Sequence, residues 1–263
     1  MKTKKNMLLL TASLLILVSC KKNNESINED KISSEKMSSS TPFSCEIKVD
    51  SATTGVRTES NGPANKLWLN GSVIRVKFIG GSALVRQRVR QYAESWETHA
   101  NIDFSFVPDN EPADIKVAFN AGGGSWSYMG TGSRNQNVSM NFGWFNDQSP
   151  ESDFRRTITH EFGHALGLSH EQSHPDANIP WNRVAVYDYY MGPPNNWTRE
   201  KVNSNVLNVS PRRGLNFTPY DQTSVMHYPV QARFTTNNVA IAQNNTRISD
   251  NDALYMRTYY PGR

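Results

Sequence analysis

Cysteine is almost absent from this chain. Only Cys20 and Cys45 occur among the 263 residues. At most one intramolecular disulfide can therefore form, which excludes a small domain held together by a disulfide framework. The fold must be stabilised by an apolar core, by a metal ion, or by both.

Long hydrophobic runs are missing as well. The apolar stretch Met7–Val18 is interrupted only by one Thr and one Ser, and as a helix it would measure about 18 Å, too short for a hydrocarbon core of about 30 Å. Three lysines precede it, and the sequence Leu-Val-Ser-Cys that follows ends at Cys20 and is similar to a bacterial lipobox. We therefore predict that residues 1–20 are a lipoprotein signal peptide and that Cys20 is the lipidation site.

Charge of one sign is also scarce. The formal net charge is +4, and three of these charges belong to lysines of the predicted signal peptide. The rest of the chain is nearly neutral and has no clustered basic stretch, so we expect no nucleic-acid partner. Residues 21–60, rich in Ser, Asn, Lys and Glu, are predicted to form a flexible tether and a short propeptide. We assign residues 61–263 to one folded, monomeric domain.

The first half of this domain carries regular patterns. Residues 73–78, 102–106, 114–119 and 138–142 alternate as strands do, and residues 82–99 follow a helical period after a possible cap at Ser82. The second half, from about Pro175, is rich in Pro, Asn and Ser, with short helices expected near 197–207 and 250–259. The pattern predicts an α+β fold with a twisted mixed sheet and two long helices in its upper half, and a loop-rich lower half with a C-terminal helix.

The most informative segment is His160-Glu161-Phe162-Gly163-His164, which is followed by Gly167 and His170. We predict a helix over 154–168, on which His160 and His164 lie one turn apart on the same face and can bind one zinc ion. Gly167 can adopt the left-handed conformation that ends the helix and turns the chain, so that His170 becomes the third ligand. Three histidines leave a fourth position for water, as in catalytic zinc sites.

Two further residues complete this chemistry. Glu161 is predicted to be the general base that takes a proton from the water and passes it to the leaving amine. Downstream, Ser224-Val225-Met226-His227-Tyr228 places Met226 in a tight turn of the kind found beneath the three histidines in metzincins.

With these motifs, the chain resembles the astacin-type zinc metallopeptidases of the metzincin clan, in the bacterial myroilysin-like branch. The resemblance covers about 65–263 and also includes the segment Gly124–Gly130. It implies a two-subdomain zinc peptidase with one Zn²⁺ per chain, which acts on proteins or peptides. It also implies that Tyr228 stabilises the transition state, and that substrate adds as a strand along a sheet edge, assigned by position to Val138, Ser139, Met140 and Asn141.

Cys45 precedes the predicted peptidase domain and has no disulfide partner if Cys20 is acylated. A thiolate is a good zinc ligand, so we predict that Cys45 binds the zinc in the proenzyme as a latency switch. The enzyme is then an exported cell-envelope lipoprotein, anchored to the membrane by its N-terminal lipid and released outside the cell once the propeptide is cleaved.

Two alternatives remain open at this point. The chain can be a metzincin closer to the matrix metallopeptidases, as a cysteine switch suggests, although the Ser-Val-Met-His-Tyr turn argues against this. It can also be a surface-tethered binding module without proteolytic activity, in which zinc is structural. The presence of Glu161 argues against the second alternative, because a structural metal site does not require that residue.

Overall fold

The computed structural model describes residues 45–48, 66–212 and 218–263. The predicted signal peptide, its Cys20 and most of the predicted tether lie outside these residues. No helix in the described ranges is long and apolar enough to cross a bilayer. All described residues belong to one compact unit.

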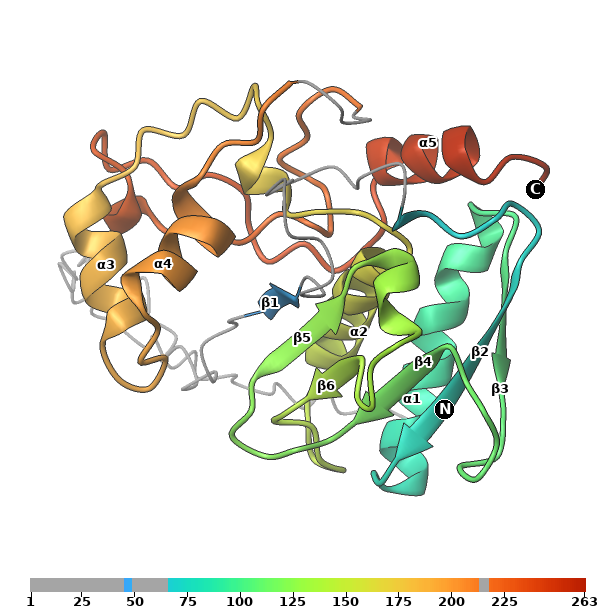
Figure 1. Ribbon diagram of the computed structural model, residues 1–263. Coiled ribbons are helices and arrows are strands. Elements are labelled where there is room, and N and C mark those ends of the chain that lie inside the picture. Colours follow the sequence, from blue (N-terminus) through green and yellow to red (C-terminus); the bar gives the residue numbers. More distant parts are fainter. Residues whose placement is uncertain (1–44, 49–65, 213–217) are drawn as a thin grey trace, which may run out of the picture. The chain divides into compact units, whose positions relative to one another are not determined.

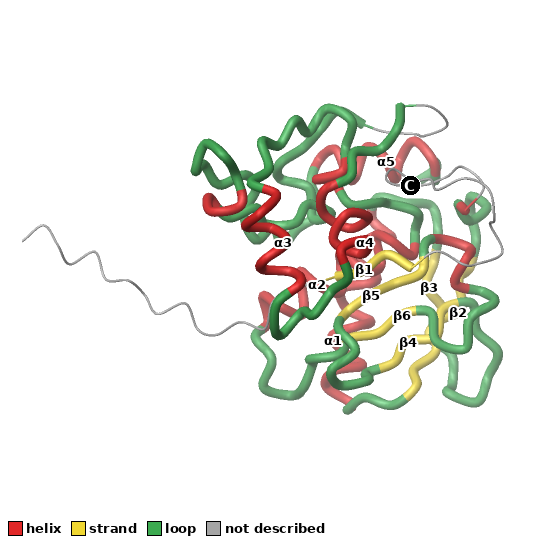
Figure 2. The backbone as a smooth tube through the Cα atoms, turned by 60° about the vertical axis from the view of Figure 1, so that its left-hand side comes forward, coloured by secondary structure: helices red, strands yellow, loops and turns green. Residues whose placement is uncertain are grey.

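A six-stranded mixed sheet forms the N-terminal half of this unit and lies at the centre and lower right of Figure 1, and Figure 2 shows its strands side by side. Its spatial order is β1-β5-β6-β4-β2-β3, and only the β5–β6 pair is antiparallel. The strands are β1 (Cys45–Lys48), β2 (Val73–Ile79), β3 (Asp103–Phe106), β4 (Ile115–Ala118), β5 (Ser125–Tyr128) and β6 (Met140–Phe142). The predicted strands are all present: β2 extends one residue further than predicted, whereas β3, β4 and β6 are shorter, and β1 and β5 are additional.

Two helices pack together over one face of this sheet (Figure 1). Helix α1 (Ala83–Ala93) begins at the predicted cap Ser82, whose hydroxyl accepts the N–H of Val85, and continues into a 3₁₀ turn, Glu94–Thr98. Helix α2 (Glu151–Ala165) carries the histidine motif. Apolar residues at period two in β2 and at helical spacing in both helices form the main core, which includes Ile74, Val76, Phe78, Val85, Val89, Phe154, Ile158 and Phe162.

The C-terminal half contains short helices and long loops. Helix α3 (Arg183–Met191) and helix α4 (Arg199–Val202), which continues into a π-helical turn at Asn203–Leu207, pack around a second apolar cluster. Helix α5 (Asp250–Tyr259) contributes Tyr255 and Met256 to the main core. Short 3₁₀ turns lie at Gly130–Ser133, Glu171–Ser173 and Ala232–Phe234. The predicted two-subdomain α+β architecture is confirmed, and α5 has the predicted bounds, whereas α3 was not expected.

Two sequence predictions need correction. Helix α2 begins at Glu151 and not at Phe154, because Pro150 has backbone angles suited to a helix start, and acidic residues fill the first turn, where the helix dipole favours them. The prediction that residues Val138, Ser139, Met140 and Asn141 form the sheet edge is wrong. Met140 and Asn141 belong to β6, which pairs with β5 on one side and β4 on the other. This strand is therefore interior and has no free edge.

The edge of the sheet beside the histidine motif is instead β5, and β1 occupies it. Cys45 lies opposite Ser125 and Lys48 opposite Tyr128 in parallel register. Part of the stretch predicted to be a tether or propeptide therefore forms an ordered edge strand of the sheet (Figure 1).

Candidate metal centre and cleft

Helix α2 brings two imidazoles of the motif together. His160 and His164 are separated by one helical turn and are both buried, with their Nε2 atoms 3.1 Å apart. Two nitrogens bound to one tetrahedral zinc at about 2.05 Å would lie about 3.4 Å apart. The spacing of the helix therefore produces a pair of nitrogens suited to a shared metal ion.

The end of α2 redirects the chain toward this pair. Gly167 has a φ of +102°, in the left-handed region. The N–H of Leu168 donates to the carbonyl of Gly163 and that of Gly167 to the carbonyl of His164, which together form a Schellman ending. His170 follows, and its ring lies 4.8 Å from that of His164. The predicted role of Gly167 as the turning point is thus seen in the backbone.

The three histidines form one buried group. One ligand atom from each of His160, His164 and His170 lies within 4.8 Å of the others. The Nε2 atom of His170 is buried and has no hydrogen-bond partner among the described residues. Burial lowers the pKa of all three rings, that of His164 to about 4, so each ring is in the neutral form that binds metals.

Backbone carbonyls orient the three rings through their other nitrogens. The Nδ1 of His160 lies 2.8 Å from the carbonyl oxygen of Val225, and the Nδ1 of His164 lies 2.7 Å from that of Leu168. Burial lowers the pKa of His170 overall, but the backbone of Asn205 lies beside its ring and raises that pKa, as a carbonyl acceptor does. These bonds fix the tautomer that leaves each Nε2 free for a metal ion. The chemistry of this donor set fits zinc.

Glu161 lies beside the histidines and is completely buried. Neither of its oxygens has a nitrogen or oxygen donor within hydrogen-bond distance among the described residues. Burial raises its pKa to about 8, while the Cys45 thiol and the guanidinium of Arg156 act in the opposite direction. A buried carboxylate with a raised pKa beside a metal site can accept and return a proton.

The turn that contains Met226 closes the floor of the site. Asp252, on α5, accepts hydrogen bonds from the Ser224 hydroxyl at 2.6 Å and from the Val225 N–H at 2.9 Å. The same carboxylate accepts the N–H of Ser249 in a capping box. The C-terminal helix thus holds the turn whose Val225 carbonyl orients His160.

Tyr228 follows this turn and packs on two of the histidines. Its ring centroid lies 4.5 Å from that of His170 and 5.9 Å from that of His160. The side chain is buried, and its hydroxyl donates to the backbone carbonyl of Cys45. A second group of possible ligands, made of Cys45, His160 and Glu161, also lies within 4.8 Å.

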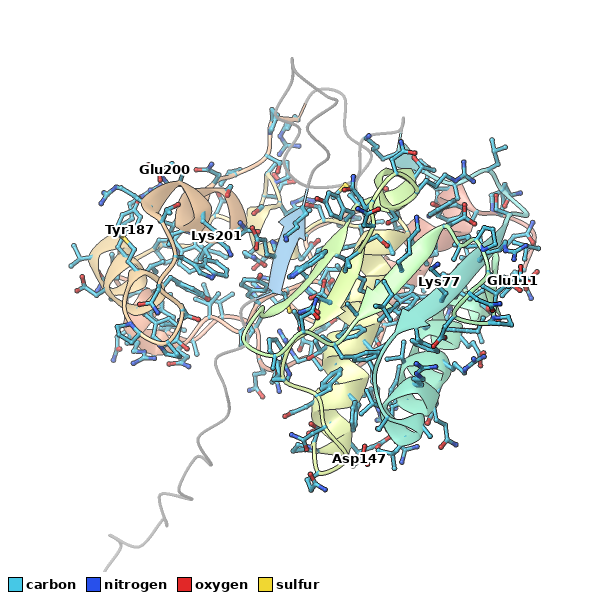
Figure 3. All side chains as sticks on the ribbon, turned by 60° about the horizontal axis from the view of Figure 1, so that its bottom comes forward. Lys77, Glu111, Asp147, Tyr187, Glu200 and Lys201 are labelled. Carbon is cyan, nitrogen blue, oxygen red and sulfur yellow. The ribbon has the colours of Figure 1, made fainter. Side chains whose placement is uncertain are left out.

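The strand β1 is therefore seated in the cleft over the metal site. The Glu46 carboxylate lies 2.7 Å from the ammonium of Lys201 on α4; Figure 3 labels Lys201. The N–H of Ile47 donates to the side-chain oxygen of Asn205 at 3.2 Å. The Lys48 ammonium lies 3.6 Å from the centre of the Trp126 ring on β5. The cleft is thus walled by β5 on one side and by α4 and the π turn on the other.

Sequence reasoning did not identify three polar residues of this cleft. Arg156 lies one turn before His160 and is completely buried. Gln172 accepts the N–H of Tyr228 at 3.0 Å and donates to the carbonyl of Asn205 at 2.9 Å. The third residue is Asn205, which provides that carbonyl. Only Arg156 had a signal in the sequence, namely its helical spacing from the first histidine. The contacts of Gln172 and Asn205 depend on how the loops fold back, and no local pattern predicts them.

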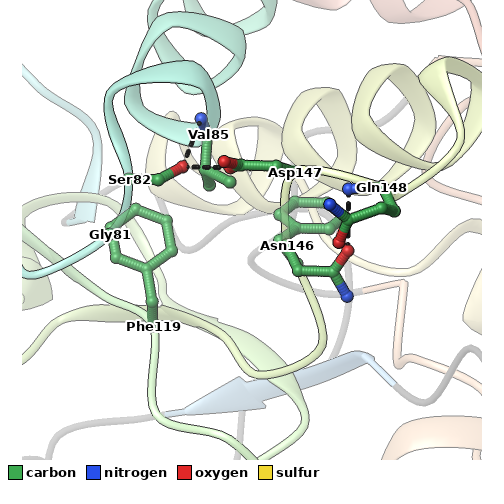
Figure 4. Close-up of a pocket in the computed structure, with 8 residues that line it drawn as sticks. Gly81, Ser82, Val85, Phe119, Asn146, Asp147 and Gln148 are labelled. Atoms are coloured by element: carbon green, nitrogen blue, oxygen red, sulfur yellow. Dashed lines mark hydrogen bonds between the residues drawn. The ribbon is translucent and has the colours of Figure 1, made fainter.

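A separate surface pocket of about 350 Å³ lies between the start of α1 and the loop before α2 (Figure 4). It is lined by Ser82, Phe119, Asn146 and Asp147, among others. None of its lining residues belongs to the metal centre.

Comparisons with known proteins agree with this geometry. The family model described as "Astacin (Peptidase family M12A)" matches residues 61–254. A solved structure of myroilysin superposes with a TM-score of 0.73 at 41% identity, over 77% of this chain and 98% of that chain. Zinc metalloproteinase nas-38 of Caenorhabditis elegans is 31% identical over 143 residues, which are 54% of this chain and 17% of that protein. Meprin A subunit alpha of Mus musculus is 35% identical over 116 residues, which are 43% of this chain and 13% of that protein. The matched region thus spans less than a fifth of these two relatives.

Proposed function

This chain belongs to the astacin family, peptidase family M12A, and we propose that it is a zinc-dependent endopeptidase that hydrolyses peptide bonds in proteins or peptides. One observation carries the proposal. His160, His164 and His170 converge within 4.8 Å, and Glu161 lies next to them with both oxygens free of nitrogen and oxygen donors among the described residues. The family match removes the first alternative, a chain closer to the matrix metallopeptidases.

The residues of the site divide the reaction between them. A bound Zn²⁺ would polarise the scissile carbonyl and lower the pKa of water. Glu161 takes a proton from the attacking water and transfers it to the leaving amine. Tyr228, with its hydroxyl at the site, donates a hydrogen bond to the oxyanion that develops on the carbonyl. The three backbone carbonyls keep the imidazoles in their metal-binding tautomer.

The position of β1 supports a latent precursor. Cys45 lies within ligand range of His160 and Glu161, and the strand that follows covers β5, the edge along which a peptide substrate would add. In the precursor the Cys45 thiolate would be a zinc ligand and would exclude the water that catalysis requires. Cleavage between Asp50 and Lys66 would free the cleft once β1 leaves.

The N-terminal assignments complete this proposal. Residues 1–20 are a lipoprotein signal peptide, Cys20 carries the lipid, residues 21–60 form the tether and propeptide, and 61–263 form the catalytic domain. The enzyme is exported and anchored to the bacterial envelope until cleavage releases it. We expect it to act as a monomer.

The proposal is tested by casein hydrolysis with the proteolytically activated chain and with Glu161→Ala. We expect the substitution to lower the rate by at least about 10²-fold, with one zinc per chain retained in both proteins by elemental analysis. Equal hydrolysis by the two proteins would refute the role of Glu161. If neither protein hydrolyses casein or a peptide library although zinc is bound, the remaining alternative, a binding module with structural zinc, is correct.

A further inference from the structure

Asn205 is in contact with both the metal centre and the peptide that lies in the cleft. Its backbone carbonyl accepts the side-chain N–H of Gln172 at 2.9 Å and lies beside the ring of His170. Its side-chain Oδ1 accepts the backbone N–H of Ile47 at 3.2 Å. One buried residue thus positions a metal ligand through its main chain and holds a peptide backbone through its side chain.

The orientation of this side chain is fixed by its neighbours. The Nδ2 group donates to the carbonyl of Lys201 at 3.0 Å and to the hydroxyl of Ser204 at 3.1 Å. Because both donors are directed into the α4 region, Oδ1 is the atom left to face the cleft. Asn205 lies in the π-helical turn Asn203–Leu207, an irregularity that is frequent at functional sites.

The contact with Ile47 does not depend on a side chain of the bound strand. In β1 one set of main-chain groups pairs with β5, and the alternate set points to the opposite side. Any extended peptide along β5 presents such an outward N–H, whatever its sequence. The oxygen of Asn205 is placed to accept it.

We propose that Asn205 is a substrate-binding residue that forms the second main-chain contact of the cleft, opposite β5. This inference rests on the proposed peptidase function. An extended substrate is then held on both sides, by the strand edge and by the Asn205 amide, while the carbonyl of the same residue keeps His170 in place. Gln172 connects this arrangement to Tyr228, whose N–H it accepts at 3.0 Å.

The test compares two synthetic peptides with the sequence of residues 43–50, which bind in the cleft in trans. In one, an ester replaces the amide between Glu46 and Ile47, which removes the N–H that Asn205 accepts. Calorimetry with the zinc-loaded, proteolytically activated enzyme should show that the ester peptide binds about fivefold more weakly. Asn205→Ala should bind the amide peptide about fivefold more weakly than the unsubstituted enzyme does, and should not distinguish the ester from the amide.

A matched control lies in the same turn. Asn203 accepts the Tyr187 hydroxyl at 2.6 Å, so Asn203→Ala removes an amide of the same turn that does not bind the peptide. This variant should keep the full difference in affinity between the amide and ester peptides. Zinc content should be one per chain in both variants, because the backbone carbonyl that orients His170 remains. For peptide substrates, Asn205→Ala should raise KM about fivefold with little change in kcat, as expected for a contact made equally in the ground and transition states.

Three outcomes would overturn the inference. In the first, the ester weakens peptide binding by the same factor in the unsubstituted enzyme and in Asn205→Ala. In the second, Asn205→Ala leaves KM unchanged, and in the third, the unsubstituted enzyme binds the ester and amide peptides equally well. The last measurement needs no variant and decides the question even if Asn205→Ala does not fold. If the unsubstituted enzyme cleaves no peptide, the proposed activity fails, but the calorimetric comparison still reports on Asn205.

Discussion

The Tyr228 hydroxyl donates a hydrogen bond to the backbone carbonyl of Cys45. This bond joins the residue after the Met226 turn to the strand that covers the site. While the bond exists, the hydroxyl is engaged by β1 and is not available to a substrate oxyanion. If β1 is a propeptide strand as proposed, this single contact connects latency with catalysis.

Removal of this hydroxyl should reduce catalysis in the activated enzyme. We expect Tyr228→Phe to lower kcat by about 10²-fold, because one donor to the developing oxyanion is lost, while zinc content stays at one per chain. The measurement is single-turnover hydrolysis of a fluorogenic peptide. Tyr187→Phe is the control, because it removes a tyrosine hydroxyl that bonds to the side chain of Asn203 at 2.6 Å and not to the strand in the cleft. Equal kcat values for the two variants would exclude a role for Tyr228 in the transition state.

Replacement of Cys45 should activate the uncleaved precursor. In Cys45→Ala the thiol that lies within ligand range of His160 is missing, so the fourth zinc position becomes open to water. We expect the uncleaved variant to hydrolyse a small peptide about tenfold faster than the uncleaved unsubstituted chain, with rates compared after the intact mass is verified. Equal latency of the two precursors would show that Cys45 is not the switch.

The ion pair between Glu46 and Lys201 should also contribute to latency. The two groups are 2.7 Å apart and only partly exposed, so the pair should contribute about 0.5–1 kcal/mol to the docking of β1. We expect Glu46→Lys to speed proteolytic activation about threefold, as measured by the rate at which activity develops with added trypsin. The charge-swapped double variant Glu46→Lys/Lys201→Glu should return to the original rate. Independent effects of the two substitutions would show that they do not interact.

The catalytic motif was predictable because its residues are close in sequence. His160, Glu161 and His164 lie on one helix, and Gly167 redirects the chain to His170 within six residues. The periodic strands and α5 were predictable for the same reason, since alternation and caps are local signals.

The edge of the sheet was not predictable in this way. Its order depends on which strand pairs with β5. This strand is the four-residue segment Ser-Trp-Ser-Tyr, in which the two serines are buried and the two aromatic residues are partly exposed, so its alternation does not mark an apolar core face. The contacts of Asn205, Gln172 and Asp252 join segments from about 30 residues to more than 150 residues apart. No periodic pattern encodes such contacts, because they arise from the packing of loops.

Removal of zinc should destabilise the domain. A ligand present at about 100 times its dissociation constant contributes about 2.7 kcal/mol, which for a domain of this size corresponds to a fall in Tm of about 5–10 °C. We expect chelation to lower the Tm of the unsubstituted chain by this amount, as measured by calorimetry. Without chelator, His164→Ala should already have the lower Tm, and chelator should not lower it further. His99→Ala, remote from the site, should lose the same amount of Tm on chelation as the unsubstituted chain does. A Tm of His164→Ala that still falls on chelation would place the metal elsewhere.

The close contact between α2 and the Met226 turn yields a last prediction. A Cβ added at Gly163 would lie 2.5 Å from the Met226 sulfur and 3.1 Å from a ring carbon of Trp96. Alanine would gain about 1 kcal/mol in helix propensity, but overpacking in a buried position costs about 1–3 kcal/mol. We therefore expect Gly163→Ala to destabilise the domain by about 1 kcal/mol, a fall in Tm of about 2–4 °C.

A double-mutant cycle with Met226→Ala assigns this cost to the sulfur contact. Met226→Ala alone should destabilise the domain by about 2–5 kcal/mol because it leaves a cavity. In that background the added methyl at position 163 no longer meets the sulfur, so Gly163→Ala should become neutral or stabilising, with a coupling energy of about 1 kcal/mol or more. The four free energies of unfolding come from denaturant titration of the zinc-loaded proteins. An equal cost of Gly163→Ala in both backgrounds would mean that the Met226 turn does not limit the approach of α2.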